Sequence, residues 1–256
     1  MIKRSTDVRA YELYLQGSHI YSHETREQLE ASRQKFHEAS TVDPEFARAW
    51  GYLAYVTMRG VMLGWRPKVE AALAEEYAKR AVSLDPEDYT NYWDLAFVHQ
   101  CMGRIDLARQ EYEKALQLNS NDADLLAEVA EMHVYAGDPQ RSIAELRRAM
   151  SLNPEVPDWY RWNMGWAYFN ARQYEAAIAE IDRIAEMPAH AYLIKAAALE
   201  KLNRHAEAES EIRRYLETNT GYDLKMLKQR TAFKAPELEE HWLTAVRAAG
   251  LPEAYD

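Results

Sequence analysis

A fixed interval of 34 residues runs through the middle of this 256-residue chain and limits what it can fold into. Turn-forming residues recur at this interval: Pro86, Ser120, Pro154 and Pro188. Two series of small residues keep the same interval: Gly103, Gly137 and Ala171, and Ala81, Ala115 and Ala149. A period of this length indicates a repeat array rather than a domain with one closed core. Because a single repeat cannot bury its own apolar face, neighbouring repeats have to stack on one another.

Helical spacing inside each repeat predicts two helices. Residues separated by four and then three positions form a triad that occurs six times: Ser32/Phe36/Ala39, Ala74/Ala78/Ala81, Ala108/Tyr112/Ala115, Ser142/Leu146/Ala149, Ala177/Ile181/Ile184 and Ala208/Ile212/Tyr215. A small residue precedes each triad: Gly17, Ala54, Ala96, Ala130, Gly165 and Ala197. A small side chain lets two helices pack at short distance, so we expect each repeat to be an antiparallel helix pair.

Proline and glycine mark the ends of these helices. Pro44, Pro86 and Pro154 each end a pair, because the residue before a proline is disfavoured in the α region. Gly137 suits a left-handed position after a helix, and Asp138 suits the N-cap of the next. We therefore expect one solenoid over residues 1–256, with a C-terminal segment at 221–256 and helix pairs at about 7–44, 45–86, 87–120, 121–154, 155–188 and 189–220.

Two places depart from the period, and the pattern changes near the C-terminus. Pro44 and Pro86 are 42 residues apart, and the excess lies around residues 59–67, as a lengthened helix or an apolar loop. The first helix of the fifth pair is shifted by one residue. Residues 236–249 predict an amphipathic capping helix whose apolar face carries Leu238, Trp242, Leu243 and Val246.

Composition argues against several classes of function. The formal net charge of −10 disfavours a nucleic-acid-binding surface, which needs clustered Lys and Arg. The single Cys101 excludes an intrachain disulfide and fits a reducing compartment. Apolar runs fall far short of the roughly 20 residues of a membrane span. We therefore expect a cytoplasmic protein that binds neither nucleic acid nor membrane.

The helix pairs and their 34-residue register resemble tetratricopeptide repeats (TPRs) over nearly the whole chain. The resemblance implies an all-α fold, a TPR-type α-solenoid in which antiparallel helix pairs form a right-handed superhelix. Residues 10–17, 233–238 and 246–253 are similar to TPR modules of bacterial class III adenylate/guanylate cyclases and of winged-helix regulators. This narrower resemblance implies a sensing module and not a cyclase, because no β-rich segment offers the two metal-binding Asp residues of that family.

In TPR arrays the first helix of each pair lines a concave groove. The resemblance therefore implies these partner-binding positions: Tyr55, Trp93, Phe97, Tyr135, Trp159, Trp162, Trp166 and Phe169. The last four are spaced by three, four and three residues and share one helix face. This aromatic stripe fits an apolar peptide or helix as its ligand. It also fits the core between repeats, where apolar stripes at helical spacing usually lie, and the sequence leaves both interpretations open.

Catalytic and metal chemistry have no support in the sequence. It lacks the G-x-S-x-G, P-loop, H-E-x-x-H and G-x-G-x-x-G motifs, so we expect no catalytic residue, metal or cofactor. His99 and His133 are 34 residues apart and are expected to be packing residues. The basic clamp with which some TPR modules hold carboxylates is not expected either, because groove positions carry residues such as Phe97 and Glu131.

Three functional hypotheses follow. The first is a non-enzymatic scaffold that binds a peptide or protein partner in its concave groove. The second is a regulatory or sensing domain of a cyclase-type or transcriptional signalling system, which the resemblance at the two ends implies. The third is self-assembly into a homo-oligomer through the apolar insertion at residues 61–65.

Overall fold

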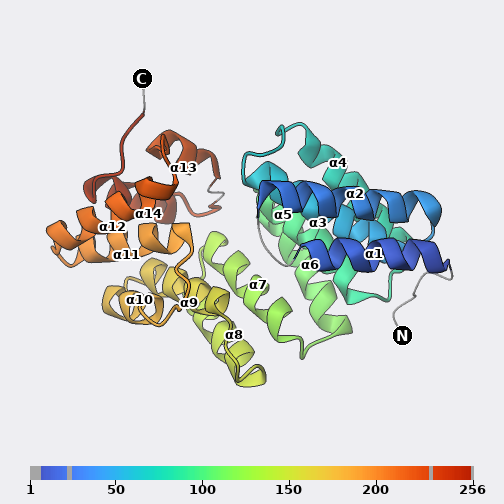
Figure 1. The fold of residues 1–256 in the computed structure, drawn as a ribbon. Coiled ribbons are helices and arrows are strands. Elements are labelled where there is room, and N and C mark those ends of the chain that lie inside the picture. The colour runs from blue at the N-terminus through green and yellow to red at the C-terminus, as the bar shows by residue number, and fades with distance from the viewer. Residues whose placement is uncertain (1–6, 22–24, 231–232, 255–256) are drawn as a thin grey trace. The chain divides into compact units, whose positions relative to one another are not determined.

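The computed structural model of the protein describes residues 7–21, 25–230 and 233–254, and these ranges contain helices and turns but no strand (Figure 1). The all-α fold expected from the sequence is thereby confirmed. The chain forms two compact units, Met1–Ser120 and Asn121–Asp256. The expectation of one continuous solenoid over residues 1–256 stays a prediction.

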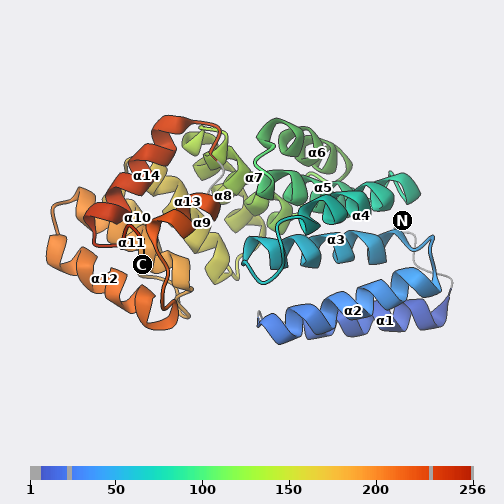
Figure 2. The ribbon, with the colours of Figure 1, turned by 90° about the horizontal axis from the view of Figure 1, so that it is seen from above.

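Unit 1 is built from helix pairs that follow one another side by side (Figure 2). The two helices of each pair pack against each other, and contacts of α2 with α3 and of α3 and α4 with α5 join successive pairs, so the core lies between successive helices, as stacking requires. The helices are α1 (Val8–Ile20), α2 (Arg26–Val42), α3 (Ala47–Met62), α4 (Glu70–Leu84), α5 (Tyr89–Cys101) and α6 (Ile105–Leu118).

Unit 2 continues the same pattern and adds two further helices at its C-terminal end (Figure 1). The paired helices are α7 (Ala123–Tyr135), α8 (Pro139–Leu152), α9 (Asp158–Asn170), α10 (Tyr174–Ile181), α11 (Ala189–Lys201) and α12 (His205–Thr218). Then come α13 (Leu224–Arg230) and α14 (Pro236–Ala248). The amphipathic helix predicted at residues 236–249 is confirmed, since Leu238, Trp242, Leu243 and Val246 are all buried.

The triads form the packing core of both units, because every one of their members is buried. The small residues upstream allow the close approach that the sequence predicts. A Cβ atom at Gly17 would lie 2.9 Å from the ring of Phe36, and one at Gly165 would lie 2.7 Å from Cγ1 of Ile181. Both glycines therefore sit where the first helix of a pair almost touches the second.

The turns inside four of the pairs share one left-handed residue. These residues are Gly103, Gly137, Arg172 and Asn203, with φ of 73°, 92°, 62° and 60°. Arg172, and not Ala171, is thus the structural equivalent of Gly137, which locates the one-residue shift of the fifth pair. Asp138 caps α8 by accepting a hydrogen bond from the N–H of Arg141, as predicted. Arg172 and Asn203 adopt this left-handed conformation at an energetic cost that glycine avoids, because glycine has no Cβ atom.

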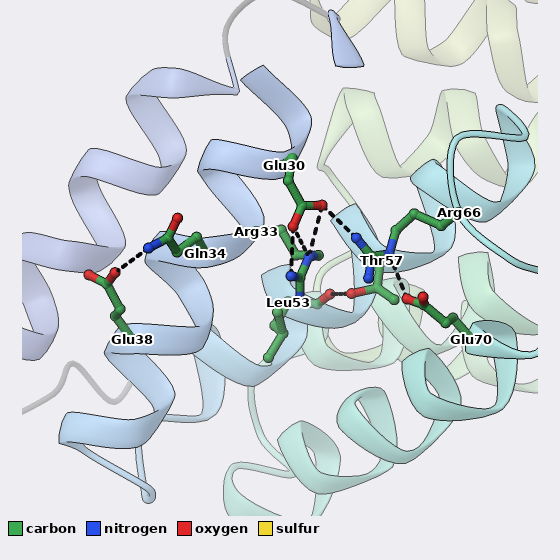
Figure 3. Close-up of polar contacts among 8 residues, drawn as sticks. All are labelled: Glu30, Arg33, Gln34, Glu38, Leu53, Thr57, Arg66 and Glu70. Atoms are coloured by element: carbon green, nitrogen blue, oxygen red, sulfur yellow. Dashed lines mark hydrogen bonds and ion pairs between the residues drawn. The ribbon is translucent and has the colours of Figure 1, made fainter. Parts of the chain in front are cut away.

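The insertion in the second pair lengthens α3 and adds a turn that folds back onto it. The N–H groups of Trp65 and Arg66 both donate to the carbonyl of Gly60, at 2.9 and 3.0 Å. The Arg66 guanidinium lies between Glu30 of α2 and Glu70 of α4, 2.5 Å from an oxygen of each (Figure 3). The sequence predicts a longer helix or an apolar loop around residues 59–67, and the structure contains both, one after the other.

The apolar side chains of this insertion pack inward. Val61 and Met62 lie against the core cluster of α3, α4 and α5, and Trp65 lies against a second cluster that includes Phe36 and Leu53. These side chains complete the core of unit 1. Because they are only partly buried, self-assembly through residues 61–65 stays a prediction.

Candidate functional site

Two of the aromatic residues predicted in unit 1 are in contact. The ring centroids of Tyr55 on α3 and Phe97 on α5 are 4.7 Å apart. Tyr21, directly after α1, extends the row, because its ring lies 5.7 Å from that of Tyr55 and its hydroxyl donates to the Tyr55 hydroxyl over 3.3 Å. Phe97 is buried, while Tyr55 and Trp93 are half-buried. Sequence reasoning missed Tyr21, although Tyr21 and Tyr55 are 34 residues apart.

Beside this row, unit 1 buries a charged cluster. The guanidinium of Arg48 lies 3.4 Å from Asp94 and 3.8 Å from Asp88, and its carbon stands 4.7 Å from the centre of the Tyr52 ring. Burial raises the pKa of Asp94 to about 7, against the lowering effect of Arg48. The charge of Arg48 is thus compensated inside the protein.

The four-residue stripe on α9 divides into two parts. Trp159 and Trp162 are half-buried, and the Trp162 ring stands edge-on to the exposed His190 of α11, with centroids 4.6 Å apart. Trp166 is only 4% exposed and Phe169 is fully buried. The first two residues are thus the accessible part of the stripe.

Trp166 and Phe169 are covered by the chain's own C-terminal segment, which we define as residues 233–251. The ring of Trp242 lies 4.8 Å from Trp166 and 5.4 Å from Phe169, and the His241 ring stacks on Phe169 at 5.0 Å. Trp166 and Phe169 are thus core residues in this structure and do not lie at open positions. The reason is burial under α14, a helix that the sequence predicts without indicating where it packs.

Tyr135, at the end of α7, is the remaining predicted groove residue. The start of the C-terminal segment covers it. The ring of Phe233 lies 5.3 Å from Tyr135 and 5.7 Å from Trp166. The backbone N–H of Lys234 donates to the carbonyl of Tyr135 over 2.8 Å. Further along, α14 packs closely against α11. The segment thus reaches the first helices of three successive pairs, and we call the surface of α7, α9 and α11 that carries Tyr135, Trp162 and Trp166 the first-helix face.

His241 is the polar residue at the centre of this contact. Its Nδ1 lies 3.2 Å from a guanidinium nitrogen of Arg172, and its Nε2 lies 3.3 Å from the hydroxyl of Tyr174. Burial, together with the positive charges of Lys201 and Arg172, lowers the pKa of His241 to about 4. The imidazole is therefore neutral near pH 7, and protonation of His241 weakens the contact.

The described residues offer neither a metal site nor a membrane span. No group of three or more His, Cys, Asp or Glu side chains in these ranges is arranged to hold a metal ion. None of the helices found there is long and apolar enough to cross a membrane. His99 and His133 are both buried, and burial lowers the pKa of His99. Their burial agrees with a packing role.

Family models described as tetratricopeptide repeat match several parts of the chain. One matches residues 130–186 and 163–223, and a second matches residues 89–122. Together these segments span half of the chain. They lie in both units and include the first-helix face of unit 2.

Curated relatives carry the same repeat. Tetratricopeptide repeat protein 8 of Caenorhabditis elegans is 28% identical over 98 residues, which is 38% of this chain and 19% of that protein. The anaphase-promoting complex subunit cut9 of Schizosaccharomyces pombe is 26% identical over 162 residues, which is 60% of this chain and 23% of that protein. The chain thus spans only about a fifth of the length of the curated relatives that it matches.

Solved structures agree on the fold. The Cut9 complex with Hcn1 superimposes with a TM-score of 0.64 at 20% identity, over 86% of this chain and 46% of that one. TTC0263, a TPR protein of Thermus thermophilus, gives 0.60 at 17% identity, over 76% of this chain and 99% of that one. At such identities the likeness concerns the fold alone. Repeat period, buried triads, family models and fold agree, and the chain belongs to the tetratricopeptide repeat family.

Proposed function

We propose that this chain is a non-enzymatic interaction scaffold whose unit 2 binds a peptide or protein partner on its first-helix face. One observation carries the proposal. Trp159 and Trp162 lie one turn apart on α9 and stay half-buried, whereas Trp166 and Phe169 on the same helix are buried. Large aromatic side chains beside a covered apolar surface are typical anchors of protein interfaces.

Unit 1 offers a second surface of the same kind. Tyr55 and Trp93 on its first helices and Tyr21 directly after α1 are half-buried, and Tyr55 contacts the buried Phe97. Repeat arrays use such extended rows of side chains for binding. We assign the stronger site to unit 2, because tryptophan is the residue that contributes most often to interface hot spots.

Affinity capture from the native lysate tests the assignment. The variant carrying Trp159→Ala and Trp162→Ala should lose the partner that the unchanged chain captures, because both anchors are removed from the surface. Trp50→Ala is the matched control, since it removes a half-buried tryptophan from unit 1 and should leave capture intact. Thermal unfolding of all three proteins shows whether they are folded. Equal capture by a folded double variant would remove unit 2 as the binding site.

A regulatory role in a cyclase-type or transcriptional signalling system is a second proposal. It rests on the resemblance of residues 233–238 and 246–253 to the tails of such modules, and all but the last two of these residues belong to the segment that covers an aromatic surface. A coding sequence that includes or adjoins a cyclase or winged-helix domain would support it. If the purified chain has no effect on the activity of that neighbour, the proposal fails.

Homo-oligomerisation and a cytoplasmic location remain proposals from the sequence alone. The net charge of −10 continues to argue against nucleic acid as a partner. Sedimentation of the purified chain at tens of micromolar measures its oligomeric state directly. A monomer there would set self-assembly aside.

A further inference from the structure

The C-terminal segment covers the first-helix face of unit 2 in the manner of a bound peptide. Phe233 inserts beside Tyr135 and Trp166, and the apolar side of α14 then places Trp242 against Trp166 and Phe169. An amphipathic helix that lays its apolar side into a groove is a common mode of peptide recognition. In this chain the groove and the helix belong to the same molecule.

We propose that residues 233–251 are an internal ligand of the first-helix face, and that its external partner is an amphipathic helix with the same pattern. That pattern is an aromatic residue followed by an apolar stripe centred on Trp. The inference deepens the proposed function and rests on it, since it names the class of partner. The partner binds after the internal segment has moved away.

The exposed side of α14 indicates which charges an external helix can carry on its outer side. Glu237 and Glu240 are exposed, while Leu238 and Trp242 between and beyond them are buried. The segment thus has the alternation of a surface helix, with its acidic residues directed away from the contact. An external helix needs the apolar side and can vary in its outer charges.

The internal contact carries polar defects that a different helix can avoid. The indole nitrogens of Trp166 and Trp242 are buried without a hydrogen-bond partner among the described residues, although these residues are only 4% and 3% exposed. A buried donor that lacks an acceptor costs free energy. An external helix that offers an acceptor to either indole would bind without this cost.

The internal segment competes with an external helix for the first-helix face, and this competition determines how strongly the external helix binds. A tethered segment acts at an effective concentration of about millimolar, and an external helix binds only to the fraction of molecules in which the face is open. Weakening the internal contact raises that fraction. The apparent affinity for an external helix should then increase in proportion.

The probe is a fluorescent synthetic peptide of residues 233–251, added to the full chain and followed by anisotropy. The Trp242→Ala chain should bind it at least tenfold more tightly than the unchanged chain, because its own segment is weakened. The matched control is Thr244→Ala, on the exposed side of the same helix, which should bind like the unchanged chain. A peptide that itself carries Trp242→Ala should not bind. Equal binding by all chains, or no binding by a folded Trp242→Ala chain, would overturn the proposal.

Hydrogen exchange of the unchanged chain tests the same proposal without a variant. If the segment is an internal ligand, the amides of α14 should exchange through a local opening that leaves α9 and α11 protected. Exchange of α14 together with α11 would mean that the helix is an integral part of the fold and would overturn the proposal. So would a dimer that the peptide dissociates, because the segment would then bind a second copy.

Failure of this proposal and failure of the proposed function can be told apart. The peptide assay uses no cellular partner and leaves Trp159 and Trp162 unchanged. The capture experiment changes only those two residues. A negative result in one experiment therefore does not determine the result of the other.

Discussion

Gly165 shows at the scale of one residue how the helix pairs are held together. A Cβ atom there would lie 2.7 Å from Cγ1 of Ile181 and 3.3 Å from the carbonyl oxygen of Ala177. One of these atoms belongs to a buried side chain and the other to backbone, so neither can move away easily. The position therefore sets the distance between α9 and α10.

Gly165→Ala should destabilise unit 2 by about 1 kcal/mol. Overpacking of this kind costs roughly 1–3 kcal/mol, and the better helix propensity of alanine returns about 1 kcal/mol. Urea unfolding measures the difference. In a chain that already carries Ile181→Ala, the same substitution should be neutral or stabilising, since the clashing atom is gone. An equal loss in both backgrounds would show that the contact is not its cause.

Asp94 gives unit 1 an unusual dependence on pH. Its pKa is raised from 3.8 to about 7 by burial, so the folded state binds a proton that the unfolded state has released between these values. The contribution of Asp94 to stability therefore falls as the pH rises from about 4 to 7. Asp94→Asn should remove this part of the pH dependence of thermal unfolding. Glu113→Gln, which removes one exposed charge from the same unit, should leave it in place.

At the scale of helices, the sequence predicts which residues pack between the two helices of a pair. It does not predict where the last helix packs. The triads and upstream small residues could be predicted because each is fixed by local spacing and by one close helix contact. The location of α14 depends on Phe233 and Trp242 meeting residues more than 65 positions earlier in the chain. No period encodes such a contact. For this reason the sequence leaves both the groove and the core interpretation open for Trp166 and Phe169, and only the structure shows that they are buried.

The left-handed turn residues show the same limit within a pair. The left-handed conformation at Gly103 and Gly137 can be predicted from the sequence, because glycine tolerates positive φ. Arg172 and Asn203 occupy the same conformation and carry no comparable signal. The period pointed to Ala171, and the shift of one residue became visible only from the backbone.

The contact of α14 should weaken in mild acid. The pKa of His241 is lowered from 6.5 to about 4 by burial, with Lys201 and Arg172 facing it and the Tyr174 hydroxyl beside it. The undocked segment therefore binds more protons between pH 6.5 and 4, and docking loses stability as the pH falls through this window. Hydrogen exchange of α14, corrected for the intrinsic effect of pH, should show more opening at pH 5 than at pH 7. His241→Gln should abolish the difference, and a change that persists in this variant would refute the assignment.

At the scale of the whole molecule, a repeat array is stabilised by each pair packing on the next. Unit 2 has three pairs of helices among its described residues, and the C-terminal segment contacts their first helices α7, α9 and α11 in addition. Residues 121–256 should therefore fold when expressed alone, with a cooperative unfolding transition and a helical circular dichroism spectrum. A fragment without helical signal would show that this unit depends on the rest of the chain.

Shortening that fragment separates the array from its C-terminal segment. Residues 121–230 keep all three pairs but lose α14, so Trp166 and Phe169 become exposed to solvent. Re-exposing two large aromatic side chains costs roughly 3 kcal/mol or more, less the conformational entropy that the released segment regains. The shortened fragment should therefore stay helical, unfold at lower urea concentration and bind the peptide of residues 233–251. If it is unfolded instead, α14 is required for the fold, and a role as an exchangeable ligand is excluded.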